Sequence, residues 1–185
     1  MQKHLRVFFA IDIPADKKKS IAKVIKPWQK NQAWQKINWA KPKNLHITLC
    51  FLGNISLTQY QYFGPSIATA IKSINKFHLE LTTLHPFPTA KNFQILSIRP
   101  QPVAELANLA LTITQTVEAC GIKTEKRSFK PHLTLGRVIT PPKLSLLAAS
   151  TFPAISFEIT KVKLFASTPK STGSVYNTIA VYNLA

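Results

Sequence analysis

Hydrophobic and polar residues follow one another along the chain with two spacings, one typical of strands and one typical of helices. Alternating or continuous apolar runs predict strands over residues 5–13, 45–52, 77–84, 93–98, 132–138, 155–165 and 175–183. Apolar positions three and four residues apart predict helices over residues 14–30, 58–74 and 103–119. We expect Gly53-Asn54 to end the second strand, and Pro86 and Pro88 to form a turn.

The order of these segments indicates the fold class. Neighbouring strands near residues 77–98 and 155–183 are typical of hairpins and argue against a wholly parallel sheet. We therefore predict an α+β fold with antiparallel sheets. A length of 185 residues suits one domain, or two small lobes that share a site. We expect residues 1–185 to form one such two-lobed unit.

One short segment occurs twice, 86 residues apart: residues 44–49 read NLHITL and residues 130–135 read KPHLTL. Each copy follows a turn and lies in a predicted strand. Side chains at i and i+2 of a strand point to the same face. His46 and Thr48 therefore project together, as do His132 and Thr134, while the apolar residues beside them enter the core. Two similar lobes that face each other would bring the two segments together.

Two imidazoles and two hydroxyls form a useful chemical set. One imidazole can remove a proton from water and the other can protonate a departing oxygen near neutral pH. Threonine hydroxyls can donate to the non-bridging oxygens of a phosphate under attack. The alternative is that both histidines are partly buried strand residues whose nitrogens are satisfied by the neighbouring threonines.

Charge and the scarcity of carboxylates narrow the choice of partner and cofactor. The chain has 24 Lys and Arg against 7 Asp and Glu, a formal net charge of +17. Such a charge attracts polyanions, although a solvated lysine-rich surface would give the same composition. The acids form no cluster that suits a hard cation, and Cys50 and Cys120 stand alone. We expect neither a metal nor another cofactor.

The apolar run at the N-terminus is short, because Asp12 interrupts it. No stretch approaches the ~18 apolar residues of a membrane-spanning helix. Two isolated cysteines are typical of a reducing compartment. We therefore expect a cytoplasmic protein that does not associate with membranes.

The chain resembles the 2H phosphoesterase family, and within it the LigT-like RNA 2′,3′-cyclic phosphodiesterases. The resemblance covers essentially the whole chain, and its most specific blocks read RVFFAIDIP (6–14), NLHITLCFLG (44–53) and RSFKPHLTLGR (127–137). It implies a bilobal, pseudo-twofold fold with two mainly antiparallel sheets, flanking helices and a central cleft. It also implies metal-independent hydrolysis of an RNA 2′,3′-cyclic phosphate to a 2′-phosphomonoester, with His46 as the proton donor and His132 as the proton acceptor.

Four further residues are candidates for binding the substrate. The resemblance makes Arg137 and Arg127 candidates for phosphate contacts, although either could equally be a surface ion-pairing arginine. Phe9 could stack a base or lie in the core, and Tyr176 could reach the substrate or serve packing. Cys50 would share a face with His46 and Thr48 in a regular strand, but nothing polar nearby argues for a nucleophile.

Two other functions remain open at the level of sequence. The protein could act mainly as a 2′-5′ RNA ligase, which is the same chemistry in reverse. It could also be a non-catalytic RNA-binding module that keeps the two motifs only as phosphate clamps. In each case we expect a monomer whose partner is an RNA end or a nucleotide with a 2′,3′-cyclic phosphate.

Overall fold

The computed structural model describes residues 4–34, 36–88, 94–125, 128–138, 152–171 and 173–185. Three helices occur in this part of the chain: α1 (Ala15–Lys30), α2 (Leu57–Lys72) and α3 (Val103–Ala119). The strands are β1 (His4–Asp12), β2 (Ile37–Trp39), β3 (His46–Ser56), β4 (Phe77–Pro88), β5 (Gln94–Gln101), β6 (Leu133–Val138), β7 (Ile155–Ile159), β8 (Lys161–Thr168) and β9 (Val175–Asn183). Two short 3-10 helices, η1 (Gln32–Trp34) and η2 (Pro42–Asn44), flank β2.

The strands form one nine-stranded sheet in the order β7-β4-β5-β6-β3-β1-β8-β9, with β2 added to β6. Every recorded strand pairing is antiparallel. The sheet has two halves, β7-β4-β5-β6 and β3-β1-β8-β9, which meet at the single pair Ile47–Leu133. The predicted α+β class is confirmed, and the two sheets implied by the family resemblance are joined at this one point.

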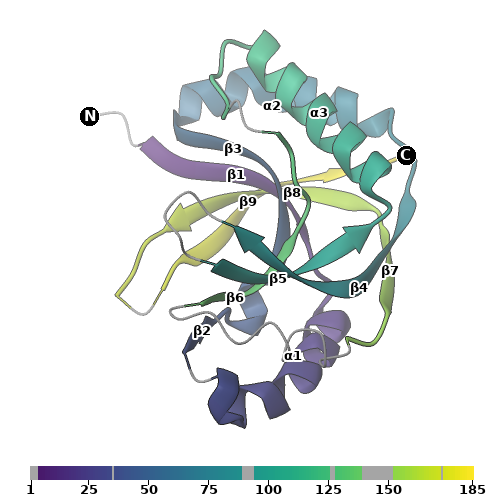
Figure 1. The fold of residues 1–185 in the computed structure, drawn as a ribbon. Coiled ribbons are helices and arrows are strands. Elements are labelled where there is room, and N and C mark those ends of the chain that lie inside the picture. The colour runs from purple at the N-terminus through teal and green to yellow at the C-terminus, as the bar shows by residue number, and fades with distance from the viewer. Residues whose placement is uncertain (1–3, 35, 89–93, 126–127, 139–151, 172) are drawn as a thin grey trace.

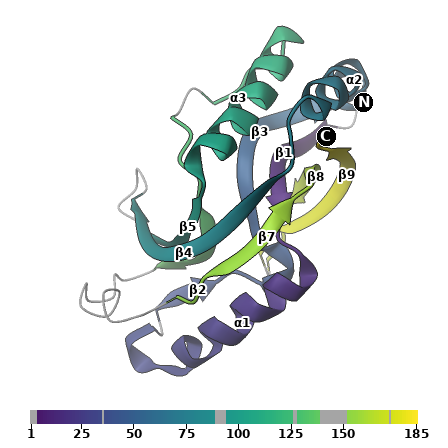
Figure 2. The ribbon, with the colours of Figure 1, turned by 90° about the vertical axis from the view of Figure 1, so that its right-hand side faces the viewer.

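The helices lie on opposite sides of the curled sheet, with α2 and α3 together at one end and α1 at the other (Figures 1 and 2). All three were predicted from the spacing of their apolar residues. In α1 that spacing places Ile21 and Ile25 in the core, and α2 begins with a capping box between Ser56 and Gln59. No helix in the described ranges is long and apolar enough to cross a membrane.

The two halves repeat one chain pattern. The order β1, α1, β3 in the first half corresponds to β5, α3, β6 in the second, and the repeated motif lies at the start of β3 and at the start of β6. The chain crosses between the halves twice. After β3 in the first half it continues into β4 in the second half, and after β7 in the second half it continues into β8 in the first half. The resulting pseudo-twofold arrangement has the Ile47–Leu133 pair at its centre.

Two predicted strand ends were wrong. β3 does not end at Gly53, which adopts φ 68° and still pairs with Val7, so the strand continues to Ser56. β4 runs through Pro86 and Pro88 and pairs with β5 along that stretch. Its other neighbour, β7, stops opposite Leu81. Prolines two residues apart lack N–H groups on the same side of a strand, and beyond Leu81 the recorded pairings give β4 a neighbour on one side only.

The predicted strand over residues 155–165 was also wrong, because it is two strands in different halves of the sheet. β7 pairs with β4, and β8, which begins after Thr160, pairs with β1. The short strand β2 had no signal in the apolar pattern. Residue 93, at the start of a predicted strand, lies outside the described residues, as does Arg127.

Candidate active site

The two motif segments lie side by side because β3 and β6 are neighbours. Their one recorded pair, Ile47–Leu133, joins the residues that directly follow the two histidines. One step along an antiparallel ladder in either direction then sets His46 opposite Thr134, and Thr48 opposite His132. The charge of His132 also contributes to the pKa of His46, which agrees with this placement. The predicted meeting of the two segments is thus present in the structure.

Both histidine rings are held by the same backbone contact. Nδ1 of His46 lies 2.6 Å from the carbonyl oxygen of Asn44, and Nδ1 of His132 lies 2.8 Å from that of Lys130. A carbonyl can only accept, so Nδ1 carries the proton and donates it in both rings. Nε2 of each neutral ring is therefore the basic nitrogen. In His46 it lies 3.1 Å from Oγ1 of Thr48, whose hydroxyl donates to it.

The surroundings lower the pKa of both histidines. Burial is the largest cause in each ring, because it penalises the charged imidazolium, and the backbone hydrogen bond opposes it. His46 has further charged neighbours: Asp12 raises its pKa, whereas Lys18 and His132 lower it. The neutral forms are thus favoured in both rings, and the charges around His46 adjust its pKa separately from that of His132.

A β-bulge follows the threonine in each motif strand. In β3 the residues on either side of Leu49 pair with adjacent residues of β1, so Leu49 has no partner in that ladder. In β6 the residues on either side of Leu135 pair with adjacent residues of β5 in the same way. An extra residue reverses the alternation of side chains beyond it. The pseudo-twofold repeat therefore extends to an irregularity of the backbone.

The bulges decide which later residues share the face of the histidines. Cys50 does not, because the bulge turns it into the main core, where burial raises the pKa of its thiol. The expectation from a regular strand was wrong for this residue. Arg137, five residues after His132, is exposed between buried neighbours and returns to the face of Thr134. Phe51, five residues after His46, occupies the corresponding position and is 45% exposed.

Aromatic side chains surround His46. The ring centroids of Phe8 and of Tyr176 each lie 5.1 Å from that of the imidazole, and the Tyr176 ring is nearly perpendicular to it. The centroid of Phe165 lies 6.5 Å away. These rings form a small cluster separate from the main core. Phe9 has no exposed surface and packs on Phe63 and Tyr182 in that core. The expectation that Phe9 could stack a base was therefore wrong, and its neighbour Phe8 faces the histidine.

An ion cluster lies beside the first motif. Asp12 pairs with His46 across the β1–β3 ladder. Its carboxylate accepts from Lys18 Nζ at 2.5 Å and from Lys163 Nζ at 2.6 Å. These hydrogen bonds and charges hold the pKa of Asp12 below its ordinary value, although burial acts in the opposite direction and is the largest single influence. Lys18 also donates to the carbonyl oxygen of Lys43, 3.0 Å away, so the cluster ties α1 to the turn before His46.

Asn44 connects this turn to the other end of the chain. Its backbone carbonyl holds His46, and its side-chain nitrogen donates to the carbonyl oxygen of Ser174 at 2.8 Å. Ser174 directly precedes β9, which carries Tyr176. The sequence analysis missed Asn44, Phe8, Phe165 and Lys163, because apolar periodicity does not mark their roles. The charge of Asp12 at the end of an apolar strand was the one available signal.

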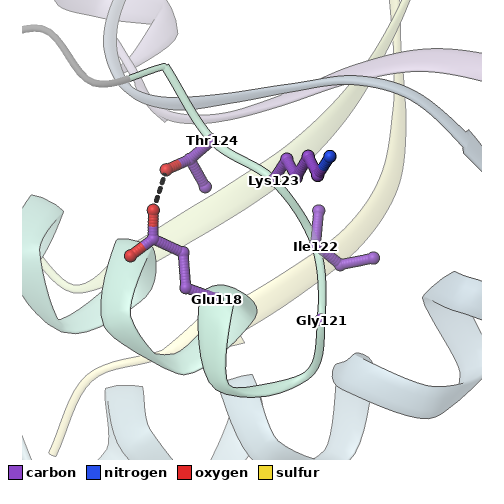
Figure 3. A pocket seen from close by; sticks show the side chains of 5 residues that line it. All are labelled: Glu118, Gly121, Ile122, Lys123 and Thr124. Atoms are coloured by element: carbon purple, nitrogen blue, oxygen red, sulfur yellow. Dashed lines mark hydrogen bonds between the residues drawn. The ribbon is translucent and has the colours of Figure 1, made fainter.

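A pocket lies beyond the C-terminal end of α3, where Thr124 donates a hydrogen bond to Glu118 (Figure 3). Its other lining residues are Gly121, Ile122 and Lys123, and neither motif contributes to it. Within the described ranges, no three His, Cys, Asp or Glu side chains are grouped in a way that could hold a metal ion.

The curled antiparallel sheet with its two His-x-Thr strands is the fold of the 2H phosphoesterases, and the predicted likeness to their LigT-like members is confirmed. The family model described as the 2′-5′ RNA ligase superfamily matches residues 18–169, so the chain belongs to this superfamily.

Relatives with established names agree with this assignment. An RNA 2′,3′-cyclic phosphodiesterase of Bacillus subtilis is 30% identical over 129 residues, which are 69% of this chain and 67% of that protein. One of Methanocaldococcus jannaschii is 29% identical over 180 residues, or 95% of this chain and 98% of that protein. The crystal structure of E. coli LigT in the apo form superposes with a TM-score of 0.76 and 26% identity, covering 99% of both chains.

Proposed function

We propose that the protein hydrolyses RNA 2′,3′-cyclic phosphates to 2′-phosphomonoesters, with His46 and His132 as the acid–base pair. The observation that carries the proposal is the pairing of Ile47 with Leu133, which sets the two His-x-Thr segments side by side. The names of the relatives supply the substrate class. Paired imidazoles with their Nδ1 protons fixed by carbonyls are suited to proton transfer through Nε2.

In the proposed reaction, Nε2 of His132 accepts a proton from a water molecule as the water oxygen bonds to phosphorus. The bond from phosphorus to O3′ breaks, and Nε2–H of His46 protonates the departing O3′. The products are a 3′-hydroxyl and a 2′-phosphomonoester, and one water is consumed. Two features support this assignment of roles: the Asp12 charge favours the protonated form of His46, and the chain supplies no such carboxylate at the matching position of β5, which is Arg99.

The threonines stabilise the negative charge that develops on the non-bridging oxygens of the phosphate. When His46 is protonated, its Nε2–H no longer accepts from Thr48, so the Thr48 hydroxyl is free to donate to a non-bridging oxygen. Thr134 holds the equivalent position opposite His46. Arg137, on the same face, adds a fixed positive charge for the phosphate. We assign Tyr176 to orienting His46 and the sugar, since its ring packs on the imidazole in a T-shaped pair, and leave Arg127 as a candidate phosphate contact.

The test is product analysis with adenosine 2′,3′-cyclic phosphate in excess EDTA. We expect the 2′-phosphate as product, full activity in EDTA, and loss of activity in His46→Ala and His132→Ala with the fold retained by circular dichroism. Activity that disappears with the chelator, a 3′-phosphate product, or activity that survives in both variants would each contradict the proposal. Size-exclusion chromatography in the same experiments checks the expected monomer.

The second candidate is 2′-5′ RNA ligation, which the description of the matching superfamily favours. The same groups would act in reverse, with a 5′-hydroxyl replacing water as the nucleophile. Incubating two RNA halves, one ending in a 2′,3′-cyclic phosphate and one starting with a 5′-hydroxyl, separates the two activities. We expect hydrolysed ends to exceed joined product at ordinary concentrations, because water is in large excess.

A further inference from the structure

Helix α1 carries a stripe of lysines that the acid–base site does not use. Lys19, Lys23, Lys26 and Lys30 are all exposed. Their spacing of four, three and four residues puts them on one side of the helix, opposite the buried Ile21 and Ile25. The stripe extends about 16 Å along the helix axis at 1.5 Å per residue. We call these four residues the lysine stripe.

The lysine stripe is not part of a uniformly basic surface. The 16 residues of α1 contain six lysines and one aspartate, whereas the 16 residues of α2 contain one lysine. The 17 residues of α3 contain two glutamates and neither lysine nor arginine. All three helices cover the sheet and turn one side to solvent, so the difference is local to α1. Like charges at these spacings destabilise a helix, yet α1 carries four lysines in this arrangement.

The lysine stripe starts beside the catalytic motif. Lys18, its neighbour in sequence, bonds both Asp12 and the carbonyl oxygen of Lys43, three residues before His46. Lys41, directly before the 3-10 turn η2, and Lys43 within it are exposed as well, and they continue the positive charge toward His46. The charge thus runs from the turn that holds the catalytic histidine out along α1.

We propose that the lysine stripe binds the sugar-phosphate backbone upstream of the cyclic phosphate, so that the preferred substrate is an RNA chain rather than a mononucleotide. The inference rests on the proposed function and adds the length of the substrate to it. A chain whose 3′ end lies at His46 must leave the site on its 5′ side, and its phosphates match a row of solvated ammonium groups. Such contacts are independent of base sequence.

The experiment compares adenosine 2′,3′-cyclic phosphate with a 12-nucleotide RNA that ends in a 2′,3′-cyclic phosphate. The stripe variant changes Lys19, Lys23, Lys26 and Lys30 to Gln, a residue with similar helix propensity. The control variant changes four exposed lysines outside α1 and η2, Lys72, Lys76, Lys123 and Lys161, to Gln. The two variants have the same net charge, and circular dichroism checks that both fold.

We expect the stripe variant to raise the KM for the RNA about tenfold at low salt, with the mononucleotide KM and both kcat values unchanged. Its RNA affinity should depend less steeply on salt, by about three units in the slope of log K against log salt, for four lost contacts. The control variant should behave nearly as the unmodified chain. Equal KM changes in both variants, or an equal change for the mononucleotide, would overturn the inference.

Two further readouts keep the result unambiguous. Fluorescence anisotropy of the same RNA with a 3′-hydroxyl end measures binding without chemistry, so the stripe is tested even if the chain hydrolyses neither substrate. Binding to vesicles that contain phosphatidylserine tests the other polyanion. If the stripe variant loses vesicle binding and keeps its RNA affinity, the surface serves a membrane and the proposed RNA path is wrong.

Discussion

The two halves of the sheet build the same His-x-Thr unit in different surroundings. In both, a histidine donates Nδ1–H to the carbonyl two residues earlier, a threonine follows, and a bulged leucine comes next. Around His46 the neighbours are aromatic rings and an ion cluster. On the second strand the position matching Phe51 is Arg137. The backbone repeat therefore supplies two equivalent groups in unlike surroundings, and the proposed mechanism assigns proton donation to the half that holds His46.

The largest expected difference between His46 and His132 appears when the leaving oxygen of the substrate is replaced by sulfur. We expect His46→Ala and His132→Ala each to lower kcat by about 10³ on a normal cyclic phosphate, within the range for general acid–base catalysis. A cyclic substrate with sulfur in place of O3′ releases a thiolate that needs no protonation. It should restore much of the rate of His46→Ala and little of that of His132→Ala. Restoration of the His132 variant instead would reverse the assigned roles.

The threonines should show a smaller difference. Thr48→Val and Thr134→Val each remove one hydroxyl at nearly constant volume, and we expect kcat to fall about 10²-fold in both. The Thr48 hydroxyl lies 3.1 Å from Nε2 of the adjacent imidazole, so Thr48→Val should also shift the pH profile, and by more than Thr134→Val does. Full pH–rate profiles of both variants provide the measurement, and identical profiles would contradict the contact seen in the structure.

The residues five positions past each histidine should affect binding more than chemistry. We expect Arg137→Gln to raise the KM for adenosine 2′,3′-cyclic phosphate by about tenfold with little change in kcat, because a fixed charge near the phosphate is lost. Phe51→Gln is the matched variant in the other half, and it removes no charge. Steady-state kinetics of both should show the larger KM change for Arg137. A similar change in the two variants would place Arg137 outside the phosphate site.

The charged residues beside the two histidines should move the pH optimum by the smallest amount. Asp12→Asn removes a charge that raises the pKa of His46, so the protonated acid is lost at lower pH and the alkaline limb of kcat/KM moves down. Arg99 holds the corresponding place in the second half, but the recorded influences on the pKa of His132 are burial and the backbone hydrogen bond to Lys130. Arg99→Gln should therefore leave the acidic limb in place, and Asp12→Asn should narrow the profile from its alkaline side alone. If Asp12→Asn moved the acidic limb instead, His46 would be the base.

The sequence predicted the helices, and the meeting of the two His-x-Thr segments, better than the course of the strands. The apolar spacing in α1, α2 and α3 is regular, and the repeated His-x-Thr pattern marks a strand face directly. The positions of Cys50 and Arg137 could not be read in this way, because each depends on one unpaired leucine that reverses the alternation. Leu49 and Leu135 look like ordinary strand leucines, and only pairing with β1 and β5 shows that they bulge.

Strand pairing also divides one continuous apolar segment of the sequence into two separate strands. Residues 155–165 form one hydrophobic run, yet β7 and β8 belong to different halves because their partners, β4 and β1, do. A local sequence pattern does not show which strand a segment will pair with when that strand lies more than 70 residues away in the chain. For the same reason Phe165 and Tyr176 gave no sign that they would meet His46.

The exchange of strands between the halves has a consequence for the order in which the site is completed during synthesis. The second half, β4 to β7, is contiguous and has left the ribosome in full once residue 159 and a few more have emerged. The first half begins with β1 and waits for β8 and β9, which bring Lys163, Phe165 and Tyr176. A nascent chain that has reached β7 therefore has both histidines and Asp12 but lacks Lys163, Phe165 and Tyr176, and the last two strands complete the surroundings of His46.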